Sequence, residues 1–131
     1  MDRGPLVREE IEAGAILARE FDKYVPLKAA FWLKASDEDQ RYLYLTSDRL
    51  DNSNRFDAYG ELIRLANVLK LPDLDPFRVK IIAGKHPLAE AAADLVREYP
   101  NATGRRFGGQ TFGDLHIDDG YVYPQLLPVA A

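Results

Sequence analysis

The residues best suited to acid–base chemistry alternate near the C-terminal end of the chain: Asp114, His116 and Asp118. Residues two apart in a strand share a face, so a carboxylate there would orient the His116 imidazole as a general base. The same side chains are ligands that several divalent ions accept. The chain has only two histidines, however, and it lacks the Gly-x-Ser-x-Gly and His-Glu-x-x-His motifs. A small hydrolase using His116 is therefore one alternative, and a polar, solvent-facing strand explains the same residues.

Three further carboxylates, Asp37, Glu38 and Asp39, lie in the connection Ser36–Gln40. A calcium-binding loop spaces its oxygen ligands along the chain and turns at a glycine, and this connection does neither. The chain has no cysteine, which excludes disulfides, thiolate metal sites and a cysteine nucleophile. We interpret the connection as an exposed acidic turn, and we expect no metal site and no cofactor.

A weak anion-binding pattern combines Lys85 and His86, which follow Gly84, with Arg105 and Arg106 further along the chain. Free backbone amides and the positive end of a helix dipole attract anions at the start of a helix. The phosphate-loop motif Gly-x-x-x-x-Gly-Lys-Ser/Thr is absent. The alternative is a tight turn in which His86 only caps the next helix.

The clearest structural pattern is the alternation in Leu27–Thr46, which predicts a β-hairpin. A period of two places alternate side chains on opposite faces of a sheet. The pattern therefore predicts one aliphatic face covered by helices and one face that mixes aromatic rings with basic side chains. The aliphatic face would comprise Phe31, Leu33, Leu43, Leu45, Val79 and Ile81, and the opposite face Trp32, Lys34, Tyr42, Tyr44, Arg78 and Lys80.

The aromatic and basic face leads to two hypotheses about binding. Tryptophan, tyrosine and arginine are enriched at protein interfaces, so we favour a non-enzymatic protein-interaction module, homodimeric through this face. Its anchors would be Trp32, Tyr42 and Tyr44, and Arg78 and Lys80 would set orientation. The alternative is binding of single-stranded nucleic acid or of a phosphate ligand, because bases stack on rings while cations neutralise phosphates. The glycine-aromatic motif of an RNA-recognition strand is absent.

Helical periodicity and turn residues predict the elements that must position these faces. They are a helix from Pro5 to about Tyr24, the hairpin, a helix from the Asn54 cap to Leu69, a strand Phe77–Ala83, a helix from Pro87 to about Tyr99, a short strand around Arg105–Phe107 or Gln110–Phe112, and a last hairpin in which Leu115–Asp118 and Tyr121–Tyr123 flank an Asp119-Gly120 turn. The order α-β-β-α-β-α-β-β predicts an α+β fold, with a mixed sheet of about five strands and three helices mostly on one face.

Length and composition bound the remaining expectations. The 131 residues fit one domain, with flexible ends expected at 1–4 and 125–131. The net charge of −4 argues against a chain coated uniformly by nucleic acid. No apolar run approaches the roughly 18 residues of a membrane span, and the first residues lack the apolar core of a signal peptide. We therefore expect a cytoplasmic protein without a membrane partner. No motif identifies a family.

Overall fold

The computed structural model describes residues 8–98, 105–107, 110–113 and 115–124. Asp114 and the ends expected to be flexible, 1–4 and 125–131, lie outside these residues. In chain order the elements are α1 (Arg8–Tyr24), β1 (Ala29–Ala35), β2 (Tyr42–Ser47), α2 (Arg55–Leu69), the 3₁₀ helix η1 (Pro76–Arg78), β3 (Val79–Ala83), α3 (Pro87–Glu98), β4 (Arg105–Phe107), β5 (Gln110–Phe112) and β6 (Leu115–Val122).

The sheet is mixed, with four longer strands in the order β3-β2-β1-β6. Strand β1 pairs antiparallel with both β2 and β6, whereas β2 and β3 pair in parallel. The three-residue strands β4 and β5 both add to β6. The predicted α+β class with three helices and a mixed sheet is confirmed, while the number and order of the C-terminal strands differ from the prediction.

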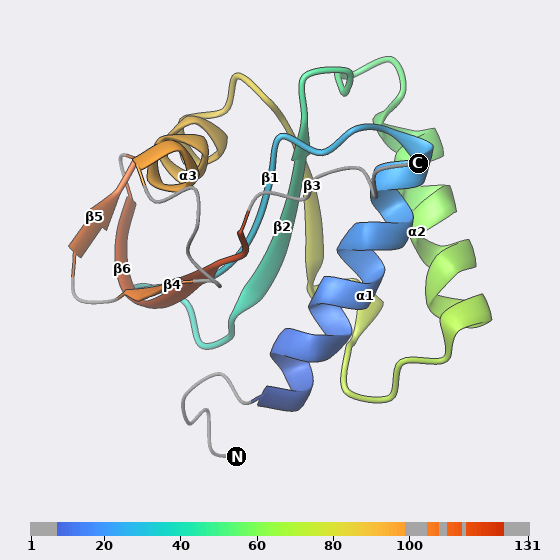
Figure 1. Ribbon diagram of the computed structural model, residues 1–131, viewed down its shortest axis with the longest axis horizontal. Helices are drawn as coiled ribbons and strands as arrows, with labels where there is room; N and C mark the ends of the chain where they lie inside the picture. The colour runs from blue at the N-terminus through green and yellow to red at the C-terminus, as the bar shows by residue number, and fades with distance from the viewer. Residues whose placement is uncertain (1–7, 99–104, 108–109, 114, 125–131) are drawn as a thin grey trace.

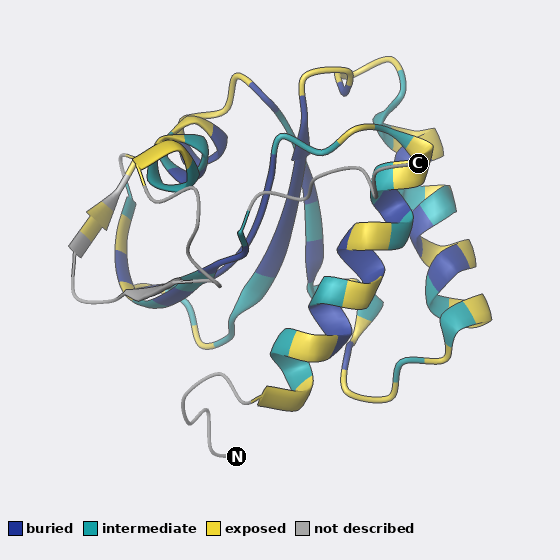
Figure 2. Cartoon of the chain, viewed as in Figure 1, coloured by how far each residue is buried: buried dark blue, intermediate teal, exposed yellow. Residues whose placement is uncertain are grey.

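The helices cover both faces of the sheet (Figure 1). Helices α1 and α2 pack together on one face, and α3 packs against β1 and β6 on the other. Two of the three helices therefore lie on one face, in line with the prediction, and α3 lies on the other. Six of the seven residues of β1 are buried, and Figure 2 shows most of this central strand in the colour of buried residues.

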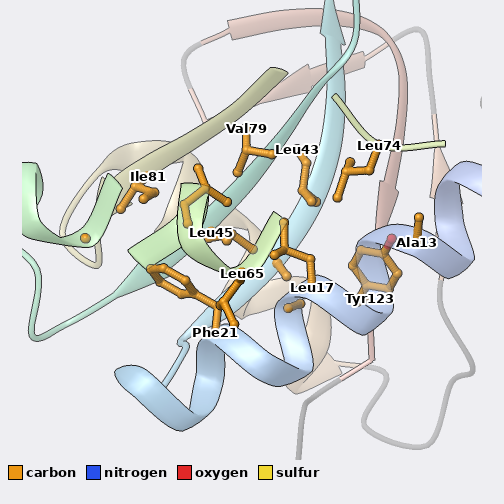
Figure 3. Packing of buried hydrophobic residues seen from close by; sticks show 14 of the residues in the cluster. Ala13, Leu17, Phe21, Leu43, Leu45, Leu65, Leu74, Val79, Ile81 and Tyr123 are labelled. Atoms are coloured by element: carbon orange, nitrogen blue, oxygen red, sulfur yellow. The ribbon is translucent and has the colours of Figure 1, made fainter. Parts of the chain in front are cut away.

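The larger core lies between the sheet and the α1–α2 pair. Helix α1 contributes apolar side chains at three- and four-residue steps, and Leu17, Ala18 and Phe21 are fully buried. They meet Leu43 and Leu45 of β2 and the apolar side of β3, as Figure 3 shows. Burying a side chain of this size is worth about 1.5–3 kcal/mol, so this interface dominates the stability of the fold.

The hairpin register places the aromatic residues differently from the expectation. Phe31 lies opposite Tyr44, and Trp32 lies opposite Leu43. Directly opposed residues share a face, so Trp32 joins Leu43 under α1 and α2, whereas Phe31 joins Tyr44 under α3. The predicted grouping of Phe31 with Leu43 and Leu45 is therefore wrong by one residue of register, which exchanges the two faces of one strand.

The predicted last hairpin is also wrong, because β6 runs without a break through Asp119 and Gly120. Asp119 pairs with Lys34 and Ile117 pairs with Ala35, so Asp118 is an extra residue on β6. This arrangement is a β-bulge, and a glycine beside a bulge is common because it adapts to the local bend. The Asp-Gly pair marks an irregularity of the strand and not a turn.

Candidate functional site

Trp32, one of the three expected anchors, is part of the core. Its side chain is only 2% exposed. The indole Nε1 donates a hydrogen bond of 2.9 Å to the hydroxyl of Tyr123, which in turn donates one of 2.6 Å to the carbonyl of Ile11. This chain of hydrogen bonds ties α1 to both β1 and the end of β6. Trp32 therefore holds the fold together and is not available to a partner.

Part of the expected aromatic and basic face does assemble on the other side of the sheet. The Lys80 Nζ lies 4.1 Å from the centroid of the Tyr42 ring and 5.6 Å from that of Tyr44. It also forms an ion pair of 3.6 Å with Glu38 from the acidic turn. We call these four residues, Glu38, Tyr42, Tyr44 and Lys80, the Tyr42–Lys80 cluster. The cluster forms because β2 and β3 pair in parallel with Tyr44 beside Lys80.

The cluster is accessible because α3 covers only part of its face. Helix α3 packs chiefly against β1 and β6, which leaves the β2–β3 part of that face less covered (Figure 1). Tyr42 and Lys80 are half-buried there. Tyr44 is buried, because its ring stacks on Phe31 with centroids 5.1 Å apart and an angle of 8° between the planes. The surface thus presents one half-buried ring and one ammonium group and not an open aromatic platform.

Electrostatics favour a charged lysine in the cluster. Partial burial alone would lower the pKa of Lys80, but the pKa is raised because Tyr44, Glu38 and Tyr42 together favour the ammonium form. Burial raises the pKa of the Tyr44 hydroxyl, so that side chain stays neutral. The cluster therefore combines a fixed cation with a carboxylate and neutral rings.

The other basic residues expected on this face lie elsewhere. Arg78 belongs to η1, before β3 begins, and the cation that lies over the tyrosine rings is Lys80. Lys34 forms an ion pair of 2.9 Å with Asp118. The structure therefore brings together Tyr42, Tyr44 and Lys80 but separates them from Trp32.

The turn before α3 fits the capping interpretation. The backbone N–H of Leu88 donates to Nδ1 of His86 over 3.1 Å, and Lys85 is exposed. Lys28, which the sequence gave no reason to single out, donates to the Gly84 carbonyl over 2.9 Å and pairs with Glu90 at 3.3 Å.

A second carboxylate, Asp48, lies 3.6 Å from the Lys28 Nζ at the same turn. The positive charge is thereby balanced by two carboxylates, which disfavours an anion at this helix start. Arg105 and Arg106 lie in β4 opposite Val122 and Tyr121, and only their backbone is described. No local sequence signal could have found the Lys28 contacts, because the residues come from three separate segments.

Of the proposed acid–base residues, His116 and Asp118 are described, and Asp118 is engaged with other side chains. The His116 side chain is exposed, and Asp118 is hydrogen-bonded to Lys34 at 2.9 Å and to Ser36 at 2.8 Å. These two bonds hold the pKa of Asp118 below its usual range. Because Asp118 is the bulged residue, the even spacing from His116 does not guarantee a shared face. Among the described residues, no cluster of histidine and acidic side chains is suited to hold a metal ion.

No helix in the described part of the chain is both long enough and apolar enough to cross a bilayer. Comparison of the chain with protein-family models, curated proteins and solved structures finds no match.

Proposed function

We propose that this chain is a non-enzymatic protein-interaction module whose contact surface is the Tyr42–Lys80 cluster. The observation that carries the proposal is the ammonium group held over two tyrosine rings on the part of the sheet face that α3 leaves less covered. Tyrosine offers a large contact area at a small entropic cost, and the Lys80 ammonium group helps to hold the Tyr42 ring in place through a cation–π contact.

The chemistry of the cluster fits a polypeptide better than a nucleic acid. Single-strand binding needs ring faces free for bases and cations free for phosphates. Here Phe31 covers one face of the Tyr44 ring, and Lys80 is already paired with Glu38. A locally neutral cluster of ring, ammonium and carboxylate is complementary to mixed polar and apolar side chains. A protein partner is therefore the better fit.

The test is a two-step binding experiment with matched variants. Affinity capture from a nuclease-treated lysate of the source cells identifies partners, and calorimetry with the purified partner measures the dissociation constant. We expect Tyr42→Ser and Lys80→Ser each to raise that constant at least tenfold. Tyr24→Ser and Lys85→Ser are the controls, because they change the same residue types at exposed positions outside the cluster.

Three results would count against the proposal. One is a partner whose affinity is unchanged in Tyr42→Ser and Lys80→Ser. Another is equal loss of affinity in the control variants. The third is tight binding of single-stranded oligonucleotides with a steep dependence on salt, which would favour the nucleic acid hypothesis instead.

A further inference from the structure

Strand β3 forms one edge of the sheet (Figure 1). It pairs with β2 on one side, and among the described residues no strand pairs with its other side. An edge strand presents a row of backbone N–H and C=O groups with which another strand can pair, so folded proteins commonly cover or block such an edge. The hydrogen bonds of β3 therefore decide whether this edge is open.

The backbone groups of β3 point alternately toward β2 and away from it. Gly84, which follows the strand, donates its N–H to the carbonyl of Ser47 at the end of β2 over 2.9 Å. Because the direction alternates along an extended strand, every second residue before Gly84 also bonds to β2. The residues between them direct their N–H and C=O groups to the edge: Val79, Ile81 and Ala83.

The two ends of this edge are closed by local turns. At the start of β3, the N–H of Val79 donates to the carbonyl of Pro76 in η1. At the end of β3, the carbonyl of Ala83 accepts a hydrogen bond of 3.1 Å from the N–H of His86. These groups are engaged within the chain and are not offered to a further strand.

The centre of the edge is closed by a side chain from a distant element. The N–H of Ile81 donates to the hydroxyl of Tyr59 over 2.9 Å, and Tyr59 belongs to α2. Ile81 is only 2% exposed, and the half-buried Tyr59 side chain packs against the core that contains Ile81. A hydroxyl that holds this N–H denies it to the carbonyl of another strand. Tyr59 therefore occupies the position that strand pairing would use first.

We propose that Tyr59 blocks the β3 edge against a further strand, and that loss of its hydroxyl lets a second copy of the chain pair there. In an antiparallel pair about a two-fold axis at Ile81, each Ile81 N–H donates to the Ile81 carbonyl of the other copy. The Ala83 N–H, which also points to the edge, then reaches the Val79 carbonyl of the other copy. The inference does not depend on the proposed function, which rests on side chains of the opposite face.

Amide hydrogen exchange followed by NMR tests the contact itself in the full chain. In Tyr59→Phe, the protection of the Ile81 N–H should fall at least roughly tenfold more than that of the Lys80 and Ile82 N–H groups, which bond to β2. Leu65→Ala is the control, because Leu65 is a buried core residue of the same helix. It should lower the protection of all three amides together. Equal losses at the three amides in Tyr59→Phe would overturn the inference.

Sedimentation velocity from about 10 to about 300 µM tests the blocking role, because this range reveals weak association. At the highest concentration Tyr59→Phe should form at least threefold more dimer than the wild type, and Leu65→Ala should match the wild type. Adding Ala83→Pro to Tyr59→Phe should restore wild-type behaviour, because proline lacks the N–H that the paired edge would use and is tolerated in edge strands. Far-ultraviolet circular dichroism confirms that each variant is folded.

The single-chain alternative is that the Tyr59 hydroxyl only satisfies a buried N–H. In that case Tyr59→Phe loses the protection of Ile81 but associates no more than the wild type, and the inference is wrong. Equal association of Leu65→Ala would mean that lower stability, and not an open edge, drives the contact. Association that persists after the addition of Ala83→Pro would assign the contact to another surface and would also overturn the inference.

Discussion

The two faces of the sheet differ in how completely they are buried. Among the residues that the structure describes, the face under α1 and α2 holds sixteen buried residues in one cluster, including Trp32 and Tyr123. On the same basis the face under α3 holds eight, including Phe31 and Tyr44. Both faces carry aromatic side chains, and the difference lies in what covers them. Two helices seal the first face, whereas one helix covers part of the second.

The comparison separates aromatic residues that build the fold from those available for binding. Trp32 and Tyr42 belong to neighbouring strands and have similar chemistry, but Trp32 is sealed by α1 and Tyr42 remains half-buried. On the first face, the polar groups of the buried aromatic side chains are hydrogen-bonded. The Trp32 indole N–H donates to the Tyr123 hydroxyl, which donates to the Ile11 carbonyl. On the second face, the Tyr42 ring instead contacts the ammonium group of Lys80 at the edge of the core.

The largest expected effect contrasts Trp32→Ala with Tyr42→Ala. Removing the buried indole leaves a cavity and should lower the free energy of unfolding by about 3–5 kcal/mol. Tyr42→Ala should cost only about 1 kcal/mol, because its ring is half-exposed and contributes mainly a cation–π contact. Urea unfolding followed by circular dichroism measures both. Similar losses in the two variants would show that the two faces are equally important to stability.

The same contrast explains what the sequence could predict. The alternation of Leu27–Thr46 correctly predicts the hairpin, because the period of two is a local property. It does not fix the register, since both faces of β1 are buried and a hydrophobic pattern then distinguishes them poorly. The prediction assumed a single aliphatic face, and it therefore grouped Phe31 with Leu43 and placed Trp32 at the surface. The position of α3, which buries the second face, is a tertiary feature.

The Tyr42–Lys80 cluster was likewise predictable only in part from the sequence. Tyr42, Tyr44 and Lys80 share a face because two strands alternate and pair in register, which follows from local patterns once the strands are known. The burial of Trp32 depends on α1, and the neutralisation of Lys28 depends on Asp48 and Glu90 from distant segments. Long-range contacts of this kind leave no local signal in the sequence.

A smaller effect should come from Tyr123→Phe, which leaves the sealed face packed but removes its hydrogen-bonded hydroxyl. The Trp32 indole N–H and the Ile11 carbonyl would lose their partner, at a cost of about 1–3 kcal/mol. Burial, the main cause, raises the pKa of Tyr123 well above its usual value. The folded chain therefore retains a proton that the unfolded chain loses above about pH 10.

Stability should consequently fall as the pH rises above that point, and Tyr123→Phe should reduce the slope of this loss. Urea midpoints between neutral and strongly alkaline pH measure it in both proteins. Tyr24→Phe is a suitable control, because it removes the hydroxyl of a tyrosine that is 41% exposed. An unchanged slope in Tyr123→Phe would mean that this buried hydroxyl does not govern alkaline unfolding.

The smallest expected effect concerns Asp118, where the bulge of β6 meets Lys34 and Ser36. Hydrogen bonds from Lys34 and Ser36, in that order, lower the pKa of the Asp118 carboxyl, and the charge of nearby His116 contributes least. Carbon-detected NMR titration should therefore show the pKa rising most in Lys34→Ala, less in Ser36→Ala and least in His116→Ala.

Because the pKa of Asp118 is lower in the folded chain than in the unfolded chain, its stabilising contribution is present at neutral pH and is lost as the pH falls through the folded pKa. Asp118 is exposed, so solvent screening should leave Asp118→Asn with a urea midpoint close to that of the wild type at neutral pH. If His116→Ala instead shifted the pKa most, Asp118 would be coupled to the imidazole, and the acid–base hypothesis for this strand would regain support.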